Sequence, residues 1–259
     1  MNENHACIPA ICVSHNRIYV AGGRSDRILS SVEYLDMDEL SWRWVTSHRY
    51  MLSPRCFTSG VLLQDQRSFF ITGGAIDSPD IDFTIIDKCE IFDTYTNSTS
   101  PIASLNRARS HHRAVLYKDR VVVIGGTFQN TFALACEEYD PNDNSWHAFP
   151  DIIRPMTGLG AVVADDCIYI CGGQSSQGIA FDVVSQFDGA IWKDLDGRLP
   201  CAFPFASGFI WNGRATFASI NVESAYMYDK TTDTWKECTS LPKYTGDLSI
   251  TRHLVALSF

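Results

Sequence analysis

The sequence predicts an all-β propeller, a ring of four-stranded antiparallel sheets, and three observations support this fold class. Four Gly-Gly pairs recur at spacings of 51, 52 and 47 residues, which indicates a repeat architecture. Each pair ends a short run rich in β-branched and aromatic residues, as expected for a strand. No segment keeps the apolar spacing of an amphipathic helix over three turns.

The Gly pairs close the second strand expected in each unit. These strands read RIYVAGG, SFFITGG, VVVIGG and CIYICGG, and end at Gly22-Gly23, Gly73-Gly74, Gly125-Gly126 and Gly172-Gly173. Glycine suits a strand end where backbones crowd near an axis or where φ is positive. The pairs therefore mark the crowded end of each strand.

The other strands of a unit follow in a fixed order. A first strand precedes each Gly pair, as in AVLY and AVVA, and residues 8–13 supply it in the first unit. A third strand reads VEYLD, CEIFD, EEYD or VSQFD, and a turn then leads to a fourth strand opened by Trp42, Trp146 or Trp235. Units this small must stack on their neighbours, with Trp and Tyr filling the space between sheets.

Five units account for nearly the whole chain. The fifth has Ser219-Ile220 where the Gly pair is expected, the second has Thr99 in place of the Trp, and the fourth has a shifted Trp192. We expect one domain over residues 1–259, with repeats at about 8–52, 53–106, 107–154, 155–202 and 203–247 and a tail at 248–259. The ring has either five blades closed by a C-terminal strand or six blades of which one is incomplete.

These motifs resemble the Kelch repeat, which combines a Gly pair, a Tyr-Asp and a Trp six residues later at a period near 50. VVVIGGTFQNTFALACEEYDPNDNSW of the third unit fits the pattern almost throughout. The resemblance implies a module for protein interaction, most often the substrate-recognition part of a cullin-based ubiquitin ligase adaptor. In those adaptors a BTB domain contacts the ligase, and this sequence contains no BTB-like helical segment. Actin association is a second role in the family, and a mutarotase-like enzyme acting on a sugar is a third.

Charge and cysteine content restrict the partners. The 21 basic and 30 acidic residues give a net charge of −9, which argues against nucleic acid or a membrane surface as partner. No apolar stretch approaches the roughly 20 residues that cross a bilayer, and no secretory signal opens the sequence. Nine cysteines, mostly in apolar runs, indicate reduced thiols and a cytoplasmic location.

Catalytic and metal motifs are missing. The sequence has no GxSxG, HExxH or GxxxxGK[ST]. His111 and His112 are adjacent on an expected strand, so they point to opposite faces, and Cys167 and Cys171 lie too far apart along a strand to share a zinc ion. We therefore expect a protein that is not an enzyme and has no cofactor or metal.

Polar residues in loops at one end of the ring are the candidate binding site. Those that follow the Gly pairs are Arg24, Ser25, Gln129, Asn130, Gln174 and Ser175, and those that precede first strands are Arg55 and Arg109. By resemblance to Kelch adaptors, the three arginines would line a substrate pocket, and forked arginine hydrogen bonds suit a short acidic peptide. Phe203, Pro204 and Phe205 would add an apolar side. The alternative is that such an arginine satisfies loop carbonyls or pairs with a neighbouring acid.

Overall fold

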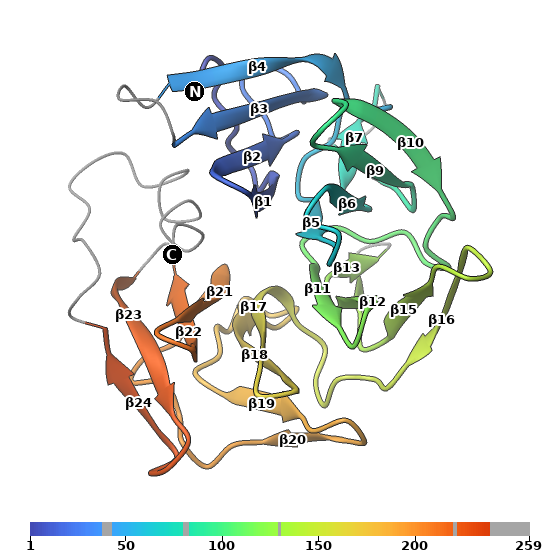
Figure 1. Cartoon of the computed structure of the whole chain (residues 1–259). Coiled ribbons are helices and arrows are strands. Elements are labelled where there is room, and N and C mark those ends of the chain that lie inside the picture. The colour runs from blue at the N-terminus through green and yellow to red at the C-terminus, as the bar shows by residue number, and fades with distance from the viewer. Residues whose placement is uncertain (38–42, 80–82, 129–130, 220–221, 239–259) are drawn as a thin grey trace.

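Five antiparallel sheets of four strands each stand around a common axis as the blades of a propeller (Figure 1). The computed structural model describes residues 1–37, 43–79, 83–128, 131–219 and 222–238. All regular secondary structure in these residues is β, so the predicted fold class is confirmed.

The strands of a blade follow one another outward from the axis, and each blade lies within one of the five sequence repeats. Blade 1 consists of β1 (Ala10–Ser14), β2 (Arg17–Ala21), β3 (Ser31–Asp36) and β4 (Arg43–Tyr50). Blade 2 consists of β5 (Ser59–Leu62), β6 (Ser68–Thr72), β9 (Cys89–Asp93) and β10 (Ser98–Ile102). Blade 3 consists of β11 (Arg113–Tyr117), β12 (Arg120–Ile124), β15 (Cys136–Asp140) and β16 (Ser145–Phe149). Blade 4 consists of β17 (Thr157–Ala164), β18 (Cys167–Gln174), β19 (Val184–Phe187) and β20 (Trp192–Asp194). Blade 5 consists of β21 (Ala206–Trp211), β22 (Arg214–Ser219), β23 (Val222–Asp229) and β24 (Thr234–Glu237).

Two short hairpins extend the loops after the Gly pairs of blades 2 and 3. They are formed by β7 (Ala75–Asp77) with β8 (Phe83–Ile85), and by β13 (Thr127–Phe128) with β14 (Thr131–Phe132). Both stand at the same end of the ring, because they continue second strands that run in the same direction.

The apolar core lies between blades. One cluster of buried side chains fills each of the four boundaries from blade 1 to blade 5. On the fourth strands, the indole N–H groups of Trp146, Trp192 and Trp235 each donate to a carbonyl just beyond the preceding blade, at 2.9 to 3.1 Å. The Trp residues therefore pack between sheets and also attach them to each other, whereas Trp42 lies outside the described residues.

The Gly pairs join each blade to the next at the backbone. The second glycine of each pair, as Gly74 in blade 2, donates its N–H to a carbonyl in the segment that leads into the next blade, here Arg109 O at 2.8 Å. We call this connection the lead-in segment. A Cβ on Gly73 would lie 2.5 Å from that same carbonyl oxygen, and its φ is +52°. Glycine is required there both by the close approach and by the backbone angle.

Blade 5 departs from this pattern. Ser219 replaces the first glycine and its Oγ bonds to Pro204 O, and the pairing of β22 with β23 shifts register between Phe217 and Ser219. Ile220 and the expected closing strand at 248–259 lie outside the described residues, and so does the closure of the ring. Among the described residues, no helix is long and apolar enough to cross a membrane.

Candidate functional site

The loops after the Gly pairs and the lead-in segments meet at one end of the ring, which we call the loop face. Backbone bridges join the two kinds of loop, as between Cys56 and Ala75 in blade 2 and between Ser110 and Thr127 in blade 3. Residues separated by about 20 positions in the sequence are therefore neighbours on this face.

The predicted partner-binding arginines of blades 2 and 3 lie inside the blades. Arg55 and Arg109 are 1% and 0% exposed. The guanidinium of Arg55 lies 2.6 Å from the carboxylate of Glu90, and that of Arg109 lies 2.5 Å from Glu137. This corrects the expectation of an exposed arginine cluster, because both side chains are closed to solvent and paired with an acid of the same chain. Arg109 also borders the loop-face pocket described below, and the Nε of each arginine has no hydrogen-bond partner.

Each of these arginines ties a lead-in segment to the rest of its blade. Nη1 of Arg109 donates to Gly125 O at 3.1 Å and to Ala135 O at 2.7 Å, and Arg55 binds the two equivalent carbonyls of blade 2. Burial raises the pKa of Glu90 and lowers that of Arg55, so desolvation opposes the charged forms of this pair. Replacing either partner of such a pair leaves the other charge buried and unpaired, which strongly destabilises the fold, so we expect the two residues to be kept or lost together.

The same two positions can be identified in other blades. The acidic position pairs with the residue two before the first glycine, and it holds Glu33, Glu90, Glu137 and Ser185 in blades 1 to 4. The basic position offers its carbonyl to the second glycine of the preceding blade, and it holds Arg55, Arg109, Met156 and Phe203 in blades 2 to 5. Blade 4 therefore lacks both charges at these two positions, as expected if each charge needs the other. Arg154 and Asp194 form an ion pair beside Ser185 instead, and both bond to its hydroxyl.

Arg24 and Ser25 follow the first Gly pair and remain on the loop face, half-buried. The guanidinium carbon of Arg24 lies 5.3 Å from the ring centre of Phe83 in blade 2, a cation–π contact. The hydroxyl of Ser25 donates to the Asp26 carboxylate at 2.7 Å. The three arginines form no common cationic pocket, since two of them are buried and paired.

Gln174 and Ser175 lie half-buried at the equivalent place in blade 4. Ser175 shapes a tight loop, because its N–H bonds to Ile179 O at 2.9 Å and its Oγ accepts from the backbone N–H groups of Gln177 and Ile179. Gln174 is the last residue of β18, the strand that leads into this loop. Their predicted counterparts in blade 3, Gln129 and Asn130, lie outside the described residues.

A pocket of about 320 Å³ opens on the loop face between blades 3 and 4. Its walls come from the hairpin loop of blade 3 and from the lead-in segments on both sides, and include Arg107, Phe128, Phe132, Leu134, Asp151 and Pro155. Sequence reasoning missed this pocket, because the variable loop between the Gly pair and the third strand has no repeat signature. The sequence feature that could have indicated the pocket is the presence of the apolar residues Phe128 and Leu134 in the same unit as Arg107.

Exposed apolar side chains also gather on this face. Of the eight large hydrophobic side chains exposed among the described residues, five lie in its loops or at strand ends beside them: Tyr50, Leu52, Leu134, Ile153 and Ile179. The last three are 40%, 47% and 58% exposed. Phe203, expected to supply an apolar side to the pocket, is instead fully buried in the core between blades 4 and 5.

The two adjacent histidines contact different neighbours. His111 stacks on Phe57 with ring centres 4.0 Å apart, whereas buried His112 places a ring nitrogen 2.7 Å from Thr72 Oγ1. Burial lowers the pKa of both histidines, that of His111 to about 4.

Arg113, the first residue of β11, connects two blades that are not neighbours in the ring. Its guanidinium donates to Ala206 O of blade 5 at 2.9 Å.

The cysteines are free thiols, six of them buried. Burial raises the pKa of Cys56, Cys89 and Cys136 to about 12, so these three stay protonated at neutral pH. Cys201 is exposed. The buried thiols act as small apolar core residues.

Known proteins share this repeat structure. The chain is 24% identical over 200 residues to Kelch-like protein 35 of Mus musculus, covering 75% of this chain and 32% of that protein. It is 23% identical over 260 residues to Kelch-like protein 25 of Xenopus tropicalis, covering 95% of this chain and 43% of that protein. Alpha-scruin of Limulus polyphemus is 25% identical over 214 residues, covering 74% and 23%. The chain thus spans less than half the length of these relatives.

A solved structure has the same fold. The structure of YjhT superposes with a TM-score of 0.76 at 13% identity, covering 92% of this chain and 86% of that one. The family model described as the KLHDC2/KLHL20/DRC7 Kelch-repeats domain matches residues 4–196, which contain all four Gly pairs and all the buried Arg–Glu pairs described above. Repeat signature, blade topology and family match agree, and the chain belongs to the KLHDC2/KLHL20/DRC7 Kelch-repeats domain family.

Proposed function

We propose that this propeller is a non-catalytic protein-interaction module that binds a peptide or protein partner on its loop face. A pocket of about 320 Å³ whose lining includes the exposed Leu134, with Ile153 and Ile179 exposed in other loops of the same face, carries this proposal. Exposed apolar groups rimmed by polar ones are typical of binding surfaces. The Kelch-like relatives support a role in protein binding.

The chemistry of the pocket refines the ligand expected from the sequence. With Arg55 and Arg109 buried, the exposed or half-buried basic groups on this face include Arg107 in the pocket wall and Arg24 beside blade 1. The exposed Arg27 lies in the same loop as Arg24. Phe128 and Leu134 offer an apolar surface next to Arg107. The ligand we propose is a short segment with one large apolar side chain in the pocket and an acidic residue beside it.

The proposed cellular role is substrate recognition for a cullin-based ubiquitin ligase, with actin association as the alternative. The relatives' names support membership of the Kelch-like group, and their remaining length would hold the parts that assemble with other machinery. A mutarotase-like enzyme is the competing class. The two buried Arg–Glu pairs make that class less favoured, because these side chains bind each other and join the lead-in segments to the blades, which leaves them unable to act on a sugar.

Affinity capture from cytosolic lysate tests the binding proposal. The baits are the wild type, a Leu134→Asp/Ile153→Asp variant of the loop face, and an Ile191→Asp control that alters an exposed isoleucine in a turn between β19 and β20. We expect proteins captured by wild type and control but lost from the loop-face variant. Equal capture by all three baits would place the binding surface elsewhere.

The ligase role has its own test. Suppressing expression of the protein in cells should lengthen the half-life of the partners that the loop face captures. Unchanged partner half-lives, with filamentous actin among the captured proteins, would favour the cytoskeletal alternative. Turnover of a sugar by the purified protein, lost in an Arg24→Ala variant, would contradict the non-catalytic proposal.

A further inference from the structure

The basic position of blade 1 is occupied by a histidine. Nδ1 of His5 lies 2.5 Å from Gly22 O, as Arg55 and Arg109 contact the first glycines of their blades. Its acidic partner is Glu33, which occupies the position of Glu90 and Glu137. Both His5 and Glu33 are 0% exposed.

The imidazole has a nitrogen with nothing to bind. A carbonyl only accepts hydrogen bonds, so the contact with Gly22 O places the proton of a neutral ring on Nδ1 and leaves Nε2 with a bare lone pair. Nε2 has no hydrogen-bond partner and lies 3.6 Å from Oε2 of Glu33. A lone pair facing a carboxylate is repulsive, whereas blades 2 and 3 place a cation at this point.

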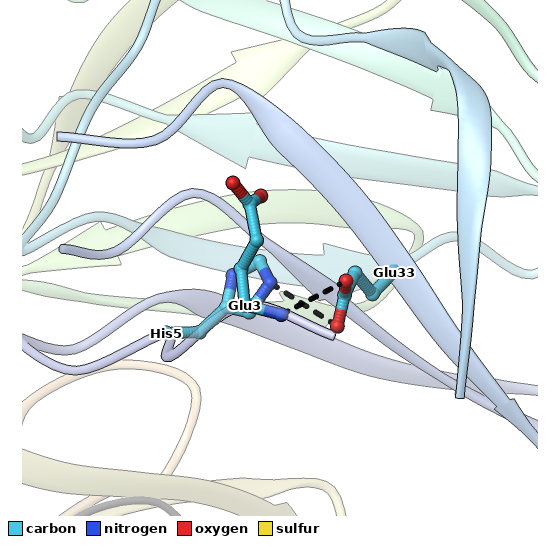
Figure 2. Close-up of side chains that lie close together, drawn as sticks. All are labelled: Glu3, His5 and Glu33. Atoms are coloured by element: carbon cyan, nitrogen blue, oxygen red, sulfur yellow. Dashed lines mark hydrogen bonds and ion pairs between the residues drawn. The ribbon is translucent and has the colours of Figure 1, made fainter. Parts of the chain in front are cut away.

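A second carboxylate lies near this pair. Figure 2 shows the carboxylate of Glu33 turned toward the imidazole of His5, whereas the side chain of Glu3, from the same segment as His5, extends away from the two. One ligand atom from each of Glu3, His5 and Glu33 lies within 4.8 Å of the others. The carboxylate of Glu3 accepts from the hydroxyl of Ser31 and lies 3.6 Å from the exposed guanidinium of Arg27. Glu3 is partly exposed, so an ion can reach the cluster from solvent.

The carboxylate of Glu33 is already fixed in position. Its Oε1 accepts from Thr46 Oγ1 at 2.9 Å and its Oε2 accepts from the backbone N–H of Asn2, also at 2.9 Å. Metal-binding groups are commonly oriented in this way by their surroundings, and the Nδ1 contact of His5 with a carbonyl does the same for the imidazole.

We propose that Glu3, His5 and Glu33 bind a divalent cation of the zinc type, which replaces the guanidinium found in blades 2 and 3. A tetrahedral zinc ion with ligand bonds of about 2.0 to 2.1 Å holds neighbouring ligand atoms about 3.3 Å apart, close to the 3.6 Å between His5 Nε2 and Glu33 Oε2. An imidazole in the set favours zinc over calcium or magnesium, which prefer oxygen ligands alone. The ion would fasten the lead-in segment of blade 1 to β3.

Zinc titration of the purified full chain tests this site, with binding measured by calorimetry and the melting temperature followed with and without zinc. Glu3→Gln removes one ligand at the partly exposed edge, so the buried pair is left intact. His5→Arg restores the residue type of blades 2 and 3 and supplies its own cation to Glu33. His147→Gln is the matched control, because His147 belongs to the exposed cluster with Asp140 and Asp143.

We expect one zinc ion per chain and a higher melting temperature for the wild type and for His147→Gln. Glu3→Gln should bind at least about tenfold more weakly. His5→Arg should fold, and its melting temperature should not respond to zinc. Absence of zinc binding by the wild type, or equal affinity in all four proteins, would overturn the proposal and leave His5 and Glu33 as a buried pair without a metal.

Discussion

Removing the charge of Arg109 tests whether the buried pairs hold the blades together. Arg109→Met leaves the Glu137 carboxylate buried and without its cation, and breaking a buried pair in this way costs about 3–5 kcal/mol. A second substitution, Glu137→Ser, then produces the pair that blade 4 already contains as Met156 and Ser185. That double variant should recover part of the loss.

The remaining loss in the double variant can be worked out from the other hydrogen bonds of the two side chains. Arg109 also donates to Gly125 O and Ala135 O, and Glu137 also accepts from the backbone N–H of Asn106, and each hydrogen bond contributes about 0.5–1.5 kcal/mol net. We expect a residual destabilisation of about 1.5–4.5 kcal/mol and a coupling energy between the two substitutions of at least about 1.5 kcal/mol.

Urea unfolding followed by tryptophan fluorescence measures these free energies, and a double-mutant cycle isolates the coupling. Arg120→Met is the control, because Arg120 pairs on the surface with Glu138 at 3.3 Å and with Asp140 at 3.0 Å, and a surface ion pair contributes at most about 1 kcal/mol. A double variant no more stable than Arg109→Met would refute the reasoning, since the unpaired carboxylate would then not be the source of the loss.

Three further predictions concern other parts of the propeller. Gly73→Ala should destabilise the fold far more than Gly178→Ala, because both have positive φ but only Gly73 lacks room for a Cβ; thermal unfolding of the two variants compares them. Stability should fall as pH drops from about 6.5 toward 4, by at most about 3 kcal/mol from His111, because the unfolded imidazole takes up a proton that the folded one refuses until about pH 4. The loss should shrink in His111→Gln, and an identical pH profile for that variant would contradict this assignment. Cys201 should react with a thiol reagent in the folded protein, whereas buried Cys136 should react only on unfolding; mass spectrometry of timed samples distinguishes them, and early modification of Cys136 would contradict its placement in the core.

The fold could be predicted from the sequence because its determinants repeat. A Gly pair every 50 residues or so, followed by a Trp on the fourth strand, specifies where strands end and where blades attach, and Trp146 and Trp235 make the contacts that this pattern requires. Trp192, whose spacing in the sequence differs from that of the other Trp residues, makes the same contact, so its indole occupies the equivalent place in the structure.

The role of the arginines was harder to predict, because it depends on a residue elsewhere in the repeat. Arg55 and Arg109 look like binding residues when their loops are considered alone. Their partners lie in the third strand, directly after Cys89 and Cys136, and the same two positions of blade 4 carry no charge. Aligning the repeats for paired gain and loss of charge would have indicated a structural pair. The pocket beside Arg107 could not be found this way, since its walls come from the loop that varies between repeats.

The backbone bond between a second glycine and the next lead-in segment affects how this chain tolerates insertions and deletions. Each such bond joins the same two places in successive repeats, as from Gly74 to Arg109 and from Gly173 to Phe203. Duplicating or removing one whole period of about 50 residues therefore recreates the same boundary, whereas a change of a few residues between a Gly pair and the next lead-in segment would have to be absorbed by a loop. Evolution of such a chain should proceed mainly by whole blades and by loop length, and the loop between the Gly pair and the third strand is where a new binding specificity can arise without disturbing the ring.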